Sequence, residues 1–205
     1  MTSPTFVVLL PVKPPARGKS RLAVDPVRRR RLAAAFALDT AHACLSADRV
    51  RAVLAVTDDA RFAADLRSAG CETIPDGVAD DLNESLRQAA AEAHRRWPDA
   101  VPAALCADLP ALSSSDLDAA LAGVPGSAGA AFVADRDAVG TTLYVAPYDA
   151  FSPSFGLGSR AAHLAAGAVE IGGDLPTLRQ DVDDSSDLEA ARRLGLGPQT
   201  RLALT

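Results

Sequence analysis

The sequence has few cysteines, and it shows neither a long apolar run nor the pattern of a signal peptide. Each absence excludes a class of protein. Its three cysteines, Cys44, Cys71 and Cys106, are odd in number and far apart, so they suit neither a disulfide framework nor a zinc site. No apolar run reaches about 18 residues, so no membrane span is expected. Residues 1–5 lack the charged start of a signal peptide. These absences predict a cytoplasmic protein, and 205 residues favour a single domain over 1–205.

Lysine is the other scarce residue. The chain has 21 Lys plus Arg, but its only lysines are Lys13 and Lys19, both in the loop after a predicted buried strand. A lysine ammonium is a compact charge suited to phosphate oxygens, and such a loop is a usual phosphate site in an open α/β sheet. A solvated basic loop is the alternative. The net charge of −5 argues against a nucleic-acid-binding surface.

Apolar runs alternate with helical patterns along the whole chain. This alternation predicts an α/β fold with a mixed, mostly parallel sheet and helices on both faces. The expected strands are 6–12, 52–56, 72–74, 103–106, 130–134, 142–146 and 169–171. The expected helices are 26–45, 60–69, 82–96, 115–122, 159–166 and 187–194, with Ser-x-x-Glu/Asp capping patterns from Ser115 and Ser186. Residues 200–205 are expected to be a loose tail or edge.

Polar side chains follow several predicted strands, where ligands bind in such sheets. They are Lys13 and Lys19, Asp58, Asp108, and Asp181, Asp183 and Asp184. Lysines and carboxylates on one rim suit a nucleoside triphosphate with Mg²⁺. Alone, Asp108 also fits a turn cap. Asp181 and Asp183 would share a face if they lay in a strand, which leaves a metal clamp and a polar turn both open.

Gly18-Lys19-Ser20 looks like the end of a Walker A loop, but the rest of the motif is missing. Its first glycine would stand where this chain has Lys13, and Pro14 and Pro15 follow. A P-loop holds phosphate with backbone N–H groups, which proline lacks. The sequence therefore argues against a P-loop ATPase or kinase.

Six short motifs occur in the order typical of one enzyme family. They are Pro11-Val12-Lys13 with Gly18-Lys19-Ser20-Arg21-Leu22, Leu82-Asn83-x-x-Leu86, Asp108-Leu109-Pro110, Asp137-x-x-Gly140-Thr141-Thr142, Phe155-Gly156-x-Gly158-Ser159-x-x-x-His163, and Asp181-Val182-Asp183-x-x-x-Asp187-Leu188. Together they resemble the phosphoenolpyruvate or 2-phospho-L-lactate guanylyltransferases of coenzyme F420 biosynthesis, within the MobA-like nucleotidyltransferases. Two positions depart from the pattern: Asp81 replaces a Gly before Leu-Asn, and Thr142 replaces an Asn.

The resemblance implies a Rossmann-like nucleotidyltransferase domain that transfers GMP from GTP to the phosphate of a small acid. One or two Mg²⁺ ions would bind to Asp108, Asp181 and Asp183. The implied GTP-binding residues are Lys13, Lys19, Arg21, Asp58 and Asn83, with Lys13, Lys19 and Asp108 taking part in catalysis. The acceptor acid would bind to Thr141, Gly156 and Ser159, because a helix start binds anions well. His163 follows Ser159 by one helical turn and is expected to point at the same site.

Some alternatives stay open at this point. Phosphoenolpyruvate is the first expected acceptor, because the Arg-rich, Lys-poor composition looks actinobacterial; 2-phospho-L-lactate is the second, and 3-phosphoglycerate also remains. A molybdenum-cofactor nucleotidyltransferase is an alternative, although Pro11-Val12-Lys13 replaces the glycine-rich first loop of those enzymes. A catalytically inactive nucleotide-binding module is another alternative, against which the intact aspartates argue. The sequence leaves the oligomeric state open, including a homodimer, and predicts no nucleic-acid or membrane partner.

Overall fold

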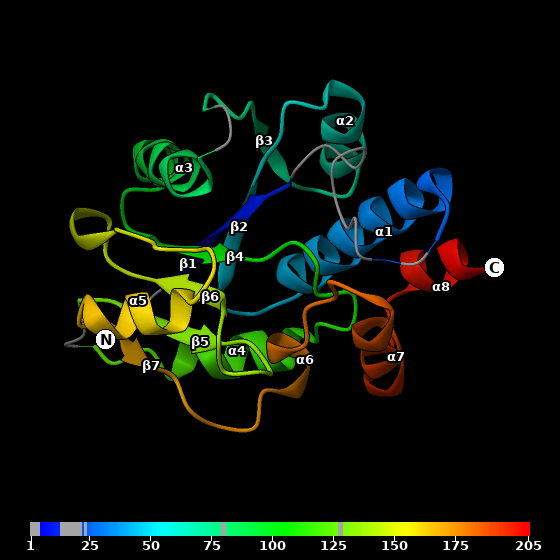
Figure 1. Cartoon of the computed structure of the whole chain (residues 1–205). Helices are drawn as coiled ribbons and strands as arrows, with labels where there is room; N and C mark the ends of the chain where they lie inside the picture. The colour runs from blue at the N-terminus through cyan, green and yellow to red at the C-terminus, as the bar shows by residue number, and fades with distance from the viewer. Residues whose placement is uncertain (1–4, 13–21, 23, 79–80, 127–128) are drawn as a thin grey trace.

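One mixed sheet forms the centre of the molecule in the computed structural model, which describes residues 5–12, 22, 24–78, 81–126 and 129–205. Over these residues the strand order is β3-β2-β1-β4-β6-β5-β7 (Figure 1). The strands are β1 (Phe6–Pro11), β2 (Val50–Val56), β3 (Glu72–Ile74), β4 (Val101–Leu105), β5 (Ala131–Ala134), β6 (Thr141–Val145) and β7 (Val169–Glu170). Only β6 runs against its neighbours, β4 and β5. The predicted strands and the mostly parallel sheet are therefore confirmed.

Helices cover both faces of this sheet. The helices are α1 (Pro26–Leu45), α2 (Ala60–Ser68), α3 (Leu82–Arg96), α4 (Ser114–Ala122), α5 (Ser159–Ala165), α6 (Pro176–Arg179), α7 (Ser185–Leu194) and α8 (Pro198–Leu204), with a 3₁₀ turn η1 (Tyr148–Ala150). Figure 1 shows α3 and α5 on the left of the sheet and α1 on its right. The expected helices are confirmed, whereas α6 and α8 were not predicted.

The core is organised around β1, which lies between β2 and β4. Val8 and Leu10 pack in a buried cluster with α1, α2 and α4, whereas Val7 and Leu9 pack in a second cluster with α3. Burial on both faces explains why β1 is a continuous apolar run rather than an alternating one. Because β1, β2 and β4 are mutually parallel in the order β2-β1-β4, their carboxyl ends meet at one edge of the sheet.

The prediction of a loose tail over 200–205 is wrong, because this segment belongs to α8. The helix starts at Pro198, a favourable first position, but Gly197 before it has no capping side chain. Instead, the carboxylate of Asp39 in α1 accepts hydrogen bonds from the Gln199 N–H at 3.0 Å and the Thr200 N–H at 2.8 Å. The cap comes from a residue 160 positions away, so local sequence patterns could not reveal it.

Two helix starts also lie earlier than predicted. The cap of α4 is Ser113, whose hydroxyl accepts from the Asp116 N–H, instead of Ser115. The cap of α7 is Asp184 instead of Ser186, and its carboxylate pairs with Asp187 in a reciprocal capping box. In both cases neighbouring Ser and Asp residues offer alternative caps.

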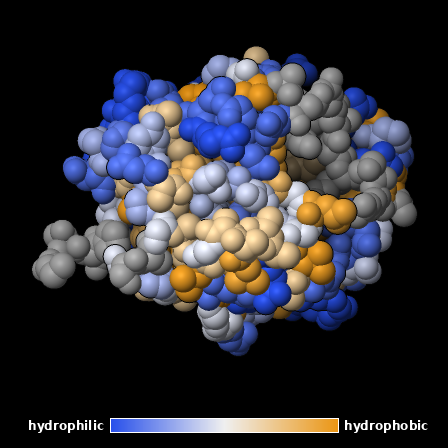
Figure 2. All heavy atoms as spheres, turned by 60° about the vertical axis from the view of Figure 1, so that its left-hand side comes forward, coloured by the Kyte–Doolittle hydropathy of each residue, from blue (hydrophilic) through white to orange (hydrophobic). Residues whose placement is uncertain are grey.

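The face formed by α3 and α5 mixes hydrophilic and apolar surface (Figure 2). Large apolar side chains exposed around α5 are Val139, Leu157, Leu164 and Val169. Leu157 is fully exposed between Gly156 and Gly158, both of which have positive φ.

Over the described part of the chain, no helix combines the length and apolarity needed to cross a membrane.

Candidate active site

Three carboxylates from distant parts of the chain converge beside the carboxyl end of β4. Asp108 follows β4, and Asp181 and Asp183 lie between α6 and α7; one oxygen from each lies within 4.8 Å of the others. The predicted grouping of these aspartates is therefore present. Asp181–Asp183 is not a strand, so the shared face that a strand would give does not apply. Instead, the fully buried Val182 donates its N–H to the Asp108 carbonyl at 3.0 Å, which joins the two segments.

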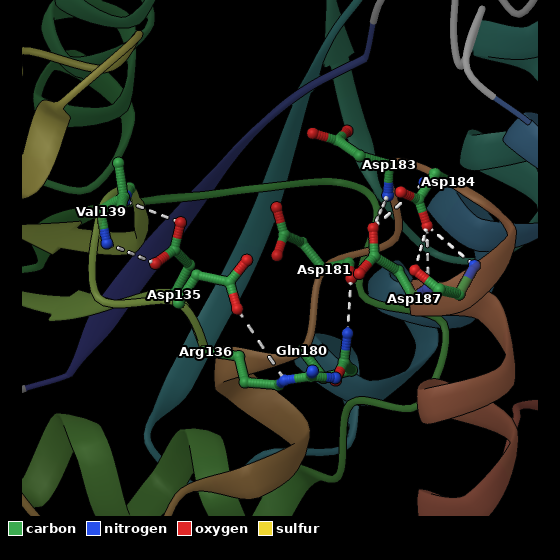
Figure 3. Close-up of polar contacts among 11 residues, drawn as sticks. Asp135, Arg136, Val139, Gln180, Asp181, Asp183, Asp184 and Asp187 are labelled. Atoms are coloured by element: carbon green, nitrogen blue, oxygen red, sulfur yellow. Dashed lines mark hydrogen bonds and ion pairs between the residues drawn. The ribbon is translucent and has the colours of Figure 1, made fainter.

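The segment that carries Asp181 and Asp183 is held by its neighbours (Figure 3). The Asp187 carboxylate accepts from the N–H groups of Asp183 and Asp184, each at 3.1 Å. The Gln180 side-chain amide donates to the Asp181 carbonyl at 2.9 Å and accepts from Arg136 at 3.0 Å. These contacts use main-chain groups of the two aspartates. In Figure 3 the Asp181 and Asp183 carboxylates extend from one short segment between α6 and α7.

The other side of the cluster is fixed by a residue that sequence reasoning missed. Thr40 is fully buried in α1, and its hydroxyl lies 3.3 Å from the Ala107 carbonyl and accepts the Leu109 N–H at 3.1 Å. Ala107 and Leu109, which flank Asp108 in the chain, are thus both hydrogen-bonded to Thr40 of α1. A threonine among alanines inside a helix is the only sequence signal for this role, because helix interiors usually favour alanine.

The three aspartates fit a hard divalent cation. All donors are carboxylate oxygens, which Mg²⁺ and Mn²⁺ prefer over nitrogen or sulfur ligands. One oxygen of each carboxylate lies within 4.8 Å of the others, so the three groups face one small volume. The cluster is therefore a candidate metal centre.

The predicted acceptor-binding residues gather around the start of α5. Thr141 opens β6, and its hydroxyl lies 3.0 Å from His163 Nδ1 in α5. Ser159 is the buried first residue of α5. The Ser159 N–H donates to the Gly156 carbonyl at 3.1 Å, and the Arg160 N–H donates to the Val139 carbonyl at 3.2 Å. Two N–H groups of the helix start are thus already bonded within the protein.

His163 is fully buried against three aromatic rings, those of Phe132, Tyr144 and Phe155. Its Nε2 accepts the Ser154 N–H at 2.8 Å. Burial lowers the pKa of His163 to about 4 from its ordinary 6.5, because charge is costly away from water. The ring is therefore neutral at neutral pH. It reaches Thr141, and that it points at the acceptor site stays a prediction.

We expect the free energy of unfolding to fall as the pH drops from 6.5 toward 4, through His163. In this window the unfolded chain protonates the ring and the folded chain does not, so acid favours unfolding. The loss should be at most about 3 kcal/mol. Urea unfolding of wild type and His163→Asn across this range measures it, since the variant lacks the titrating ring. Parallel pH curves for both proteins would contradict the expectation.

Asn83 holds the Phe155 backbone on both sides. Its amide donates to the Phe155 carbonyl at 2.9 Å and accepts the Phe155 N–H at 2.7 Å. The nearby departure, Asp81, is explained by the helix: its side chain caps α3 by accepting the Glu84 N–H at 3.0 Å. The other departure, Thr142, is fully buried in β6. Asn83 thus links α3 to the loop that bears Gly156.

Of the remaining predicted residues, Lys13, Lys19 and Arg21 fall outside the described residues. Asp58 is exposed after β2 and is not among the clustered carboxylates. A second missed residue is Asp135, whose carboxylate accepts the N–H groups of Val139 at 2.9 Å and Gly140 at 2.7 Å and so shapes the loop before Thr141 (Figure 3).

Comparison with known proteins agrees with these features. The family model described as "Guanylyl transferase CofC like" matches residues 6–189. The phosphoenolpyruvate guanylyltransferase of Thermomonospora curvata is 48% identical over 200 residues, covering 96% of this chain and 87% of the relative. That of Streptomyces scabiei is 46% identical over 209 residues, covering 97% and 95%.

A solved structure shows the same fold at low identity. It is 4-diphosphocytidyl-2C-methyl-D-erythritol synthase, with a TM-score of 0.65 and 13% identity over 93% of this chain and 99% of the other. The fold is therefore that of nucleotidyltransferases. Because the family model spans most of the sequence and two relatives match nearly its full length at more than 45% identity, this chain belongs to the CofC-like guanylyltransferase family.

Proposed function

We propose that this chain is a phosphoenolpyruvate guanylyltransferase. A phosphate oxygen of phosphoenolpyruvate attacks the α-phosphorus of GTP and forms a new P–O bond. The bond from that phosphorus to the oxygen bridging to the β-phosphate breaks, and pyrophosphate leaves with the electron pair. The observation that carries the proposal is the convergence of Asp108, Asp181 and Asp183 in a chain at 46–48% identity to enzymes of this name.

Asp108, Asp181 and Asp183 would hold Mg²⁺. When bound, such a cation neutralises charge on the reacting phosphates and favours an in-line displacement. The carboxylates themselves fix its place beside β4, because the Val182 N–H and the Thr40 hydroxyl hold both segments. Their combined negative charge also gives the site its preference for a cation over a neutral ligand.

The cationic residues of the first loop are assigned to the triphosphate. Lys13, Lys19 and Arg21 would bind the β- and γ-phosphates and the departing pyrophosphate, where lysine and arginine offset developing charge. This role is proposed from the sequence. Its support in the structure is that β1, which precedes these residues, ends at the same edge of the sheet as β4. Asp58 and Asn83 are proposed to contact the guanosine, with Asn83 also holding the loop at Phe155.

Thr141, Gly156 and Ser159 are proposed to bind the acceptor acid. The segment of Thr141 is joined to α5 by two contacts. The Thr141 hydroxyl is hydrogen-bonded to His163, and the Arg160 N–H donates to the Val139 carbonyl. No general base is required, because a phosphate dianion is already a nucleophile. The product would be a guanosine diphosphate-linked acid for coenzyme F420 biosynthesis, and GTP and a phosphorylated acid are substrates found in the cytoplasm.

We expect pyrophosphate release from GTP and Mg²⁺ to require phosphoenolpyruvate. Parallel reactions with phosphoenolpyruvate, 2-phospho-L-lactate, 3-phosphoglycerate and no acid would measure it with a coupled pyrophosphate assay. Release with 2-phospho-L-lactate alone would keep the reaction class but change the acceptor. GTP binding without release in any reaction would instead favour another nucleotidyltransferase or an inactive nucleotide-binding module.

A further inference from the structure

The side chain of Thr141 is turned toward His163 by an irregularity in the sheet. Val133 pairs with Leu143, but Ala134 pairs with Thr141, so β6 has one extra residue between the two pairs. Leu143 packs in the cluster of α1 and α4, whereas His163 stacks on Tyr144, which packs in the cluster of α3. In a regular strand Thr141 would share the face of Leu143. A bulge of this kind re-aims a side chain and is common beside active sites.

The hydrogen bonds of His163 assign its ring protons. The Ser154 N–H can only donate, and it lies 2.8 Å from Nε2, so Nε2 must present its lone pair. A neutral ring then carries its hydrogen on Nδ1. Nδ1 therefore donates to the Thr141 hydroxyl oxygen at 3.0 Å. Because that oxygen accepts from the ring, the hydroxyl hydrogen of Thr141 must point to another acceptor.

We propose that His163 is a positioning residue that orients the Thr141 hydroxyl to donate its hydrogen to an anionic oxygen of the acceptor acid. This inference rests on the proposed function. An anionic oxygen can only accept hydrogen bonds. With the hydrogen on Nε2, the ring would instead take the Thr141 hydrogen and turn hydroxyl lone pairs toward the anion. The Ser154 contact thus selects the tautomer that makes Thr141 a donor.

The same ring supports the loop that carries the other acceptor residues. Ser154 is bonded to Nε2, and the next residue, Phe155, is held by Asn83 through two hydrogen bonds. Gly156 follows directly, and its carbonyl accepts the Ser159 N–H. One buried imidazole therefore connects the positions of Thr141 and of the loop before α5. A change at His163 should alter acceptor binding more than GTP binding.

Two substitutions separate the contacts of the ring. In His163→Asn the side-chain NH₂ can take the place of Nδ1–H toward Thr141, but no acceptor reaches Ser154. In His163→Gln an amide oxygen can take the place of Nε2 toward Ser154, but no donor occupies the Nδ1 position. We expect His163→Gln to raise the KM for phosphoenolpyruvate roughly 10- to 100-fold, the usual effect of losing a hydrogen bond to a charged group. The KM for GTP should change by less than about threefold, and His163→Asn should keep the acceptor KM closer to wild type.

A double-mutant cycle tests the route through Thr141. Thr141→Val removes the hydroxyl at nearly constant volume and should raise the acceptor KM about as much as His163→Gln, whereas Thr141→Ser should keep it near wild type. Combining His163→Gln with Thr141→Val should add little, since both remove one hydrogen bond. The ¹⁵N chemical shifts of the wild-type ring should show the hydrogen on Nδ1, without any use of activity.

The outcomes distinguish the inference from the function on which it rests. An unchanged acceptor KM in His163→Gln, an additive double variant, or an Nε2–H ring would overturn the inference in an enzyme that still releases pyrophosphate. Equal losses in His163→Asn and His163→Gln would also overturn it, because they would indicate packing alone. If either variant fails to fold, the Thr141→Val and Thr141→Ser pair and the ring shifts still decide. Wild type that releases no pyrophosphate with any acid would reject the proposed function itself.

Discussion

Replacing Asp108 by Asn should lower kcat/KM for pyrophosphate release about 1,000-fold. The carboxylate belongs to the cluster with Asp181 and Asp183, and the amide removes one negative ligand from the proposed Mg²⁺ site. A metal-bound transition state depends on such a ligand for several kcal/mol, and about 4 kcal/mol corresponds to the expected loss. The coupled pyrophosphate assay with GTP and phosphoenolpyruvate measures it.

The fold should survive this substitution. The contact that joins the two segments runs from the Val182 N–H to the Asp108 carbonyl, and it does not use the side chain. Thermal unfolding without metal should therefore show a Tm close to that of wild type.

Asp99→Asn is the matched control, because Asp99 is exposed and precedes β4 at the opposite edge of the sheet. It should retain activity. Titration with Mn²⁺ followed by electron paramagnetic resonance should show weakened binding in Asp108→Asn and unchanged binding in Asp99→Asn. Wild-type rates and Mn²⁺ affinity in Asp108→Asn would show that the metal assignment is wrong.

Replacing Asp39 by Ala should destabilise the protein by about 2–4 kcal/mol, which lowers Tm by roughly 5–15 °C in a domain of this size. The buried carboxylate accepts the Gln199 and Thr200 N–H groups at the start of α8. Alanine leaves both donors without this partner and removes a negative charge from the helix start, where it is favourable. Urea unfolding followed by circular dichroism measures the change.

Two further variants show whether the effect comes from this cap. Asp39→Asn keeps one acceptor oxygen and should lose about half as much stability. Gly197→Ala should destabilise by about 1–3 kcal/mol, because a Cβ at this position would collide with the Asp39 carboxylate. In the Asp39→Ala background that collision is gone, so the two effects should not add. Additive effects, or an Asp39→Ala protein as stable as wild type, would contradict the tertiary cap.

Local patterns were sufficient for most of the framework. Asp25 and Pro26 predict the start of α1, and the structure shows the Asp25 carboxylate accepting the Val27 and Arg28 N–H groups. The apolar run of β1 predicts a buried strand, and β1 lies inside the sheet between β2 and β4 with both faces covered. These predictions succeed because caps and apolar periodicity act over a few residues.

The patterns were weaker where two local solutions compete. Ser113 and Ser115 both precede a helix, as do Asp184 and Ser186, and the sequence favoured the later residue in each case. The structure uses the earlier one. At Ser113 a contact with another helix takes part, because its N–H donates to the Thr177 hydroxyl in α6 at 3.0 Å. At Asp184 the contacts are local: hydrogen bonds from the Ser186 hydroxyl and then the Asp187 N–H hold the pKa of its carboxyl below the usual range.

The sequence by itself determined the family, the seven strands and the identity of the three clustered aspartates, because motifs and apolar runs are local in the chain. Only the tertiary structure decided how those residues meet: Val182 binding Asp108, Asp39 capping α8, and the bulge in β6 that turns Thr141 to His163. These contacts join residues 22 to 161 positions apart. Their energies depend on burial and on strand register, which no short stretch of sequence specifies.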